Sequence, residues 1–546
     1  MEPDRPRDDS DEADLARLGY AQQLLRDMGG FSNFAISFSI ISILTGAVLL
    51  YGYGLKFAGP IVNTVGWPIA SLMTLAVAAS MGELASAYPT AGGLYFWAFR
   101  LGGKGTAWAT AWLNMIGQVT ATAGINIAAA TYLIGAVVRI FGIAPETTVP
   151  LLGATTDWNF QVAVMALIMV PQVLVNCFGI RPAARLNDIS VWWHIGGVLA
   201  IVGCLAVLGK HHNPTGFLLQ ATTTTTPLDA SSAEIAGRTV PALVFGDIKL
   251  PSPLFAIAPW LRDLYAAAPI PLVFVLALLQ AQWTYTGYDA SAHVAEETKM
   301  ARKNAAWGIV LSVGVSAVAG YALLLALTWC IPNGDIAATA SDTYPVLQIL
   351  SGNLPKALAD ALSLVIGGAM WLCGSASISS MGRMWYAFAR DDGMPGSRWL
   401  KQVHPRFRTP IPAIVATSVL TVATCVWAAA YPVVTSISTI ALYLAYVIPI
   451  ALNARNRRTG RGEHVSAANA AWNLGRHARW VNAVAIGWVA VLAVVFSLPP
   501  NELVLWTTLL LGAVLAAYWF GYARGRFAGP TPADEAVLRA DLEAGG

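Results

Sequence analysis

The stretch GELASAYPTAGGLYFW, residues 82–97, closes a long apolar run and opens a turn. Pro89 and the glycine pair after it stop a helix, because proline has no amide hydrogen and glycine permits a sharp turn. Arg100 and Lys104 follow at once, and basic residues collect in loops on the cytoplasmic side of a membrane. The stretch therefore indicates the cytoplasmic end of a membrane-spanning helix.

Composition supports a membrane protein. Of 546 residues, 56% are hydrophobic and 12% charged, against roughly 25% charged in soluble chains. The net charge of +3 gives no argument for binding nucleic acid. The five cysteines have no metal-ligand spacing, so neither a metal nor a cofactor is expected. The acidic start lacks the features of a signal peptide, so the first apolar run is expected to belong to the mature protein.

Apolar runs give the number of helices. A bilayer core about 30 Å thick requires roughly 20 mainly apolar residues per helix. Twelve such runs are predicted to be transmembrane helices: 31–57, 61–87, 106–139, 160–180, 189–209, 270–294, 305–331, 357–388, 411–430, 433–453, 480–498 and 503–523.

Loop charge gives the orientation. Lys and Arg concentrate in the loops after the even-numbered runs, for example at 100–104, 299–303 and 455–479, whereas the other loops hold few. Both termini are therefore predicted to be cytoplasmic, in a plasma membrane, taken as a bacterial inner membrane. The tails, 1–28 and 527–546, are expected to be mobile. The Thr- and Pro-containing segment 210–269 is expected to be an irregular extracytoplasmic loop.

Residues 82–97 resemble the signature of the amino acid-polyamine-organocation superfamily, in its amino acid/choline transporter branch. Three further stretches agree with this resemblance: WLNMIGQVT at 112–120, YTGYDASAHVAEET at 285–298 and MGRMWYAFARDDGMP at 381–395. The resemblance covers about residues 20–525.

The resemblance implies an all-α membrane protein of twelve transmembrane helices with a leucine-transporter-type five-plus-five inverted repeat. The two copies would be residues 29–209 and 270–453, followed by 454–526 with a cytoplasmic loop and helices 11 and 12. In such folds, helices 1 and 6 are broken near the bilayer midplane and form the binding site.

Polar, glycine-containing interruptions occur at 42–46 in the first helix and 284–289 in the sixth. An unwound segment frees N–H groups for a carboxylate and carbonyl groups for an ammonium, so a zwitterion fits both. Asn126 continues the polar face of helix 3, although such side chains also stabilise helix contacts. The candidate substrate-binding residues are Ser42, Thr45, Gly46, Ala47, Gln118, Thr122, Thr284, Tyr285, Gly287 and Tyr288.

Ionisable residues inside a membrane are costly and are functional candidates. Glu83, His194 and Asp289 are the candidates for coupling or gating. The resemblance places Asp289 beneath the substrate and His194 where relatives carry a basic group in place of a sodium ion. Histidine titrates near neutrality, which favours a proton as the coupling ion.

Sodium is the alternative coupling ion. Its ligands would be helix 8 hydroxyls, although Arg383 nearby would discourage a cation. The hydroxyl groups are those of Ser377, Ser379 and Ser380.

The sequence therefore predicts an amino acid permease, a symporter that works by alternating access without a chemical step. The alternative substrates are 4-aminobutyrate, choline and a polyamine. A membrane-embedded enzyme or sensor is the competing class, but such an enzyme would show clustered His, Asp or Glu ligands at membrane depth.

Overall fold

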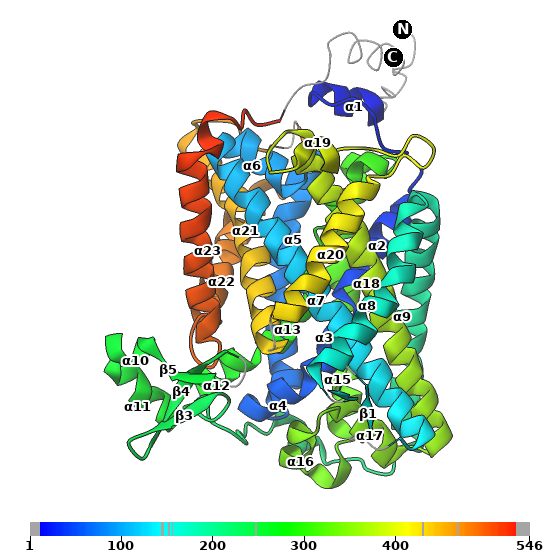
Figure 1. Cartoon of the computed structure of the whole chain (residues 1–546), viewed down its shortest axis with the longest axis vertical. Helices are drawn as coiled ribbons and strands as arrows, with labels where there is room; N and C mark the ends of the chain where they lie inside the picture. Colours follow the sequence, from blue (N-terminus) through cyan, green and yellow to red (C-terminus); the bar gives the residue numbers. More distant parts are fainter. Residues whose placement is uncertain are drawn as a thin grey trace.

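The structure is a computed structural model that describes residues 11–143, 147–150, 153–155, 157–245, 248–427, 431–466 and 469–530. It is a bundle of long helices that run in roughly the same direction (Figure 1). Among the described residues, ten helices are long and apolar enough to cross a membrane. An eleventh span is added if the pair Pro259–Ala267 and Ile270–Thr284, bent by 90°, counts as one.

Each predicted apolar run coincides with a helix or a group of helices. The ninth corresponds to α20 (Ile411–Trp427), a shorter apolar helix. The first run is divided into α2 (Gly30–Ile41), α3 (Gly46–Leu49) and α4 (Tyr51–Ala58). The sixth is divided into α12 (Ile270–Ala277), α13 (Leu279–Thr284) and α14 (Ala290–His293).

The other long helices are mostly continuous. They are α5 (Trp67–Ala87, preceded by the π-helix η1, Val62–Gly66), α7 (Lys104–Phe141), α8 (Trp158–Cys177), α9 (Ile180–Leu208), α15 (Ala301–Trp329), α18 (Lys356–Arg390), α21 (Tyr431–Thr459), α22 (Ala478–Val495) and α23 (Glu502–Gly521). The short helices between them include α6 (Leu94–Gly102), η3 (Ala295–Glu297), α16 (Ile336–Ser341), α17 (Pro345–Asn353) and α19 (Ser397–Leu400).

Burial separates central helices from peripheral ones. The apolar part of α7 is 78% buried within the protein, whereas that of α23 is 6% buried. Side chains such as Leu510, Val514 and Phe520 on α23 are exposed. An apolar surface of this extent is stable against lipid and not against water. The bundle is therefore built to lie in a membrane, with α7 at its centre.

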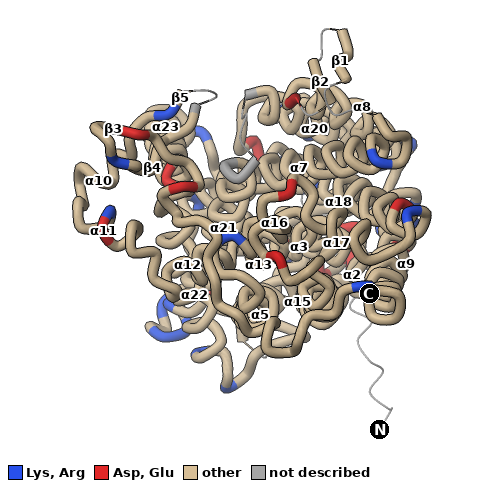
Figure 2. The backbone as a smooth tube through the Cα atoms, turned by 90° about the horizontal axis from the view of Figure 1, so that it is seen from below, with Lys and Arg blue, Asp and Glu red and all other residues tan. Residues whose placement is uncertain are grey.

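The two ends of the bundle differ (Figure 1). Helices α1 (Asp11–Arg17), α6 and α19 lie at one end, called here the α1 end. Strands β3–β5 and helices α10 (Pro253–Ile257), α11 (Pro259–Ala267) and α16 lie at the other, called the sheet end. Seen from the sheet end, most of the chain is uncharged (Figure 2).

The segment 210–269 is more ordered than the predicted irregular loop. It contains the 3-10 helix η2 (Thr215–Leu219) and a sheet of order β3-β4-β5. Its strands β3 (Ser232–Ile235), β4 (Arg238–Phe245) and β5 (Ile248–Pro251) are antiparallel. Ala236 and Gly237 join β3 to β4, and both have positive φ, as a two-residue hairpin turn of type I′ requires. A smaller pair, β1 (Thr148–Val149) and β2 (Gly153–Ala154), lies elsewhere.

The described part of the N-terminal tail is packed, contrary to the prediction that the tail is mobile. Leu15 and Tyr20 are buried. The N–H groups of Asp27 and Met28 donate to the Glu297 carbonyl at 3.0 and 2.9 Å. Residues 1–10 and 531–546, parts of both predicted tails, lie outside the described residues.

Candidate functional site

The break in the first helix exposes backbone groups. Ser42 adopts a left-handed conformation with φ 33°. Its carbonyl accepts from the N–H groups of Thr45 at 2.7 Å and Gly46 at 3.0 Å. Among the described residues, the N–H groups of Ile43 and Leu44 have no acceptor. Two backbone donors are therefore left free inside the bundle.

The break in the sixth helix has the same property. Gly287 has φ +85°, which favours glycine. Its N–H donates to the Tyr446 hydroxyl at 3.2 Å. The N–H groups of Thr286, Tyr288 and Asp289 have no acceptor in the described chain. Buried backbone donors are nearly always paired in folded proteins, so unpaired donors at both breaks indicate a place for an external acceptor.

The two breaks lie against each other. A Cβ atom at Gly46 would lie 2.5 Å from Thr284 Oγ1 and 2.7 Å from its Cα. A Cβ atom at Gly287 would collide with the side chain of Ile40. Both predicted glycines are thus required by the close approach of helices 1 and 6. Whether they also contact a ligand stays a prediction.

His194 lies beside the first break. It is fully buried on α9, and its Nε2 lies 2.6 Å from Ser42 Oγ. Ser42 Oγ in turn lies 2.6 Å from Thr45 Oγ1. The Nδ1 atom lies 2.7 Å from the Ser190 carbonyl. Three predicted residues, Ser42, Thr45 and His194, are therefore joined in one hydrogen-bonded chain.

Asp289 follows the second break and belongs to a cluster of buried polar side chains that the sequence did not reveal. Its Oδ1 accepts from the Tyr446 hydroxyl at 2.9 Å, and its Oδ2 accepts from Asn114 Nδ2 at 2.9 Å. His293 Nε2 lies 3.1 Å from the same Oδ2. Asp289 is 1% exposed and His293 is 0% exposed. The carboxylate is fully engaged by protein groups.

Tyr285 and Tyr288 flank Gly287 and are both buried. The Tyr285 hydroxyl lies 2.6 Å from Ser71 Oγ, and its carbonyl accepts from the Tyr443 hydroxyl at 3.0 Å. The Tyr288 hydroxyl has no hydrogen-bond partner among the described residues. Tyr285 therefore holds the break in place, whereas the Tyr288 hydroxyl lies beside that of Tyr443.

The helix 3 candidates face α18. Thr122 Oγ1 lies 2.6 Å from Ser377 Oγ, and Asn126 Nδ2 donates to the Thr122 carbonyl at 3.0 Å. Neither side-chain polar atom of Gln118, nor Ser379 Oγ, has a partner among the described residues. No described hydrogen bond joins these side chains to either break, so the structure does not bring them to the candidate site through polar contacts.

Glu83 lies apart from the other coupling candidates. It is 1% exposed, and its carboxylate accepts from Arg457 Nη2 at 3.0 Å and from the Leu474 N–H at 3.1 Å. It joins α5 to the end of α21 and the segment before α22. Its role in coupling or gating stays a prediction.

Two buried ion pairs lie between Asp289 and the α1 end. Glu297 Oε2 and Oε1 accept from Arg383 Nε and Nη2 at 2.7 and 3.2 Å. Glu296 pairs with Arg390 through two hydrogen bonds of 3.0 and 2.9 Å. Arg383 was expected to discourage a cation, but Glu297 neutralises its charge, so that argument against sodium fails.

The tail and α6 contact the same region. The Tyr20 and Tyr95 hydroxyls donate to Asp391 at 2.8 and 3.0 Å. Asp27 pairs with Arg181 at 2.6 Å and Lys299 at 3.2 Å, and these two cations lower the pKa of its carboxyl group. No role was predicted for Glu296, Glu297 or Asp391, although the motifs at 285–298 and 381–395 contain them.

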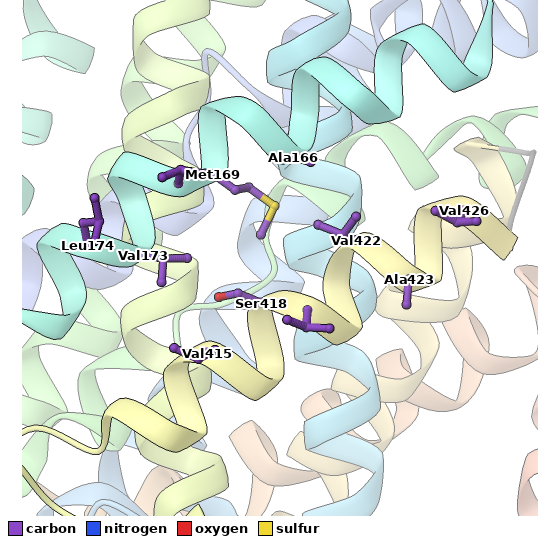
Figure 3. A pocket seen from close by; sticks show the side chains of 11 residues that line it. Ala166, Met169, Val173, Leu174, Val415, Ser418, Val422, Ala423 and Val426 are labelled. Atoms are coloured by element: carbon purple, nitrogen blue, oxygen red, sulfur yellow. The ribbon is translucent and has the colours of Figure 1, made fainter. Parts of the chain in front are cut away.

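A cavity of about 510 Å³ lies elsewhere, between α8 and α20. Met169 and Val173 of α8 face Val415, Ser418 and Val422 of α20 (Figure 3). The Ser418 hydroxyl donates to the Ile414 carbonyl of its own helix. The lining offers no free polar group for a zwitterion, so this groove is not the candidate site.

The fold and the paired breaks define a polytopic membrane transport protein with its candidate site at the centre of the bundle. Residues 28–519 match the family model described as amino acid permease. The chain belongs to this family, as the motifs predicted, and it is a permease for amino acids and not an enzyme.

Several curated relatives are similar over most of their length. Amino-acid permease BAT1 of Arabidopsis thaliana is 31% identical over 549 residues, covering 96% of each chain. Its homolog in Oryza sativa is also 31% identical, over 547 residues and 96% of each chain. The GABA-specific permease of Saccharomyces cerevisiae is 27% identical over 414 residues, covering 74% of this chain and 64% of its own. These eukaryotic relatives give no support to the predicted bacterial membrane.

Proposed function

We propose that the protein is a secondary active transporter that binds a zwitterionic amino acid between residues 42–47 and 284–288 and moves it by alternating access. The observation that carries this proposal is the set of unpaired backbone N–H groups at both breaks. Inside a bilayer, an unsatisfied backbone group costs several kcal/mol. A carboxylate that accepts from these donors removes that cost.

The ammonium group has acceptors at the same place. Unwinding frees carbonyl groups at the end of α2, where those of Ser39 and Ile41 accept no hydrogen bond among the described residues. The Ser39 hydroxyl is unpaired within the described chain as well. Free donors and free acceptors at one break match the two charged ends of an amino acid.

The surroundings of Asp289 favour an amino acid over a polyamine. A polycation requires carboxylates free to face it, and Asp289 already bonds Asn114, Tyr446 and His293. The alternative substrate is 4-aminobutyrate, which is also a zwitterion and for which one relative is named.

The proposed topology has twelve crossings with both termini in the cytoplasm. The twelve comprise the ten long helices, the bent pair and α20. Residues 29–209 and 270–453 would form the two five-helix repeats. The α1 end would face the cytoplasm, since the Lys- and Arg-rich loops predict that side, and the membrane would be the plasma membrane.

The structure supports an occluded state for this cycle. The break residues Ser42, Thr45, Thr284 and Tyr288 are each at most 2% exposed, and the ion pairs of Glu296 and Glu297 close the α1 end. We propose that these pairs must separate for substrate to leave toward the cytoplasm.

The test is uptake of a radiolabelled panel of amino acids, 4-aminobutyrate, choline and putrescine into proteoliposomes, with and without imposed proton and sodium gradients. Accumulation of at least one zwitterion is expected. Uptake of putrescine or choline alone would contradict the proposed site.

A further inference from the structure

Both ring nitrogens of His293 face acceptors. Nδ1 lies 3.1 Å from the carbonyl oxygen of Ala91, and Nε2 lies 3.1 Å from Asp289 Oδ2. Ala91 belongs to the turn 88–93 between α5 and α6. The turn also packs on the ring, since a Cβ atom at Gly93 would lie 3.3 Å from His293 Nδ1. His293 therefore connects α14, the part of helix 6 that follows the break, to this turn.

Counting protons shows what these contacts require. A carbonyl oxygen has no hydrogen to give, so Nδ1 must carry one. A second proton must lie between Nε2 and Oδ2, either on the imidazolium or on the carboxylic acid. If only one proton is present, two lone pairs face each other at one of the two contacts. The observed geometry therefore belongs to a pair that holds two protons and has no net charge.

The neighbouring groups do not supply that proton. Tyr446 of α21 and Asn114 of α7 already donate to Asp289. The carboxylate of Glu296 in η3 reaches the same turn, where it accepts from the Ala91 N–H at 3.1 Å, and it is paired with Arg390 of α18. Arg390 also lies 3.9 Å from the centre of the Tyr20 ring. The charges around the pair are thus balanced without it.

His194 behaves differently. Its Nε2 faces the Ser42 hydroxyl, which can either donate to it or accept from it. Ser42 can then accept from or donate to Thr45 by rotation of both hydroxyls. A proton can therefore bind or leave His194 without breaking a hydrogen bond, so only the burial of its charge, and no lost contact, would link its protonation to the conformation.

We propose that Asp289 and His293 together form the binding site of the coupling proton. This inference rests on the proposed transport function. Release of the proton leaves a net negative charge in a buried site and breaks the contact to Ala91 or to Asp289. Both effects are relieved when water reaches the pair from the α1 end. Proton binding therefore stabilises the closed α1 end, and proton release accompanies its opening.

The first test uses proteoliposomes that contain wild type, His293→Gln or His194→Gln. One transported proton per substrate lets a gradient of about one pH unit support about tenfold accumulation, since each factor of ten corresponds to about 1.4 kcal/mol. The wild type should approach this ratio. The His293→Gln variant should fall to a ratio near one yet still exchange internal for external substrate. The His194→Gln variant should keep the wild-type pH dependence of whatever uptake it retains.

Wild-type accumulation by His293→Gln would overturn the proposal, as would loss of pH dependence in His194→Gln alone. If His293→Gln does not fold, the wild type can be tested alone by hydrogen exchange in detergent between pH 5 and 9. After correction for the intrinsic exchange rate, protection of residues 88–93 should fall about tenfold or more as the pair loses its proton, equal to about 1.4 kcal/mol. Constant protection would overturn the proposal. If the wild type transports no amino acid, the proposed function fails, while the exchange measurement still tests the proton site.

Discussion

Removing one member of the Glu297–Arg383 pair should be severely destabilising. Both side chains are 0% exposed, and the two hydrogen bonds between them measure 2.7 and 3.2 Å. The substitution Glu297→Gln keeps the shape of the side chain but leaves the Arg383 charge buried without a counter-ion. Breaking a buried pair in this way costs about 3–5 kcal/mol. The Ser379 carbonyl, which accepts from Arg383 Nη1 at 3.2 Å, carries no formal charge and cannot replace the carboxylate.

The chain provides a matched control in Asp27→Asn. Asp27 pairs with Arg181 at a shorter distance, 2.6 Å, but the two side chains are 30% and 65% exposed. An exposed pair contributes about 0–1 kcal/mol. Both variants remove a carboxylate that bonds an arginine, and Asp27 also bonds Lys299 at 3.2 Å, so the main difference between the two sites is burial.

The assay is the free energy of unfolding of purified protein in mixed detergent micelles, measured for Glu297→Gln, Arg383→Gln and the double variant. The double variant should lose less free energy of unfolding than the two single variants lose together, because it contains no unpaired charge. A loss below about 1 kcal/mol for Glu297→Gln, equal to that of an exposed pair, would refute the reasoning that this pair is dry and closes the α1 end.

Three further predictions concern the contact between the two breaks, the Asp27 ion pair and the topology. Gly46→Ala should lower the yield of folded protein in size-exclusion chromatography, because its Cβ would lie 2.7 Å from the Thr284 Cα. The control Gly196→Ala should not lower the yield, because a Cβ there would have no atom within 4 Å. Equal yields would show that the breaks are not in close contact. Because the pKa of Asp27 is lowered, its ionised carboxylate stabilises the fold at pH above the ordinary value of 3.8, and this stabilisation is lost as pH falls through the lowered pKa. The difference in thermal midpoint between wild type and Asp27→Asn should therefore disappear in acid. A difference that stays constant with pH would contradict the ion pair. Reporter fusions at 210–269 and 455–479 should report opposite sides of the membrane, and matching sides would contradict the proposed topology.

The sequence was sufficient for the long helices because membrane insertion depends on composition over about 20 residues. It also located both breaks, since polar and glycine residues in the middle of an apolar run are a local signal. The sheet at 232–251 was missed because its hairpin turn, Ala236-Gly237, is a weaker signal than Asn-Gly or Asp-Gly. The Thr- and Pro-rich surroundings also resembled an irregular loop.

The polar contacts of the site were not predictable in the same way. His293 lies 202 positions from Ala91, and Asp289 lies 175 positions from Asn114. Asp289 was a candidate from its own position, but its partners Asn114 and His293 look ordinary in their stretches, and their contacts appear only when the fold brings them together. Local sequence therefore indicated His194, whose position in an apolar helix is visible from its neighbours alone.

The link between the N-terminal tail and the segment after helix 6 has a consequence for how this region tolerates change. Met28 and Thr298 form a parallel bridge, and the Lys299 N–H donates to the Met28 carbonyl at 2.9 Å. These bonds involve only main-chain atoms, so they do not depend on which side chains occupy the positions. A change of side chain there leaves these main-chain bonds possible, whereas insertion or deletion of a single residue between Tyr20 and Met28 would shift their register. The fold therefore constrains the length of this short segment as well as the residues, such as Tyr20 and Asp27, whose side chains make contacts of their own.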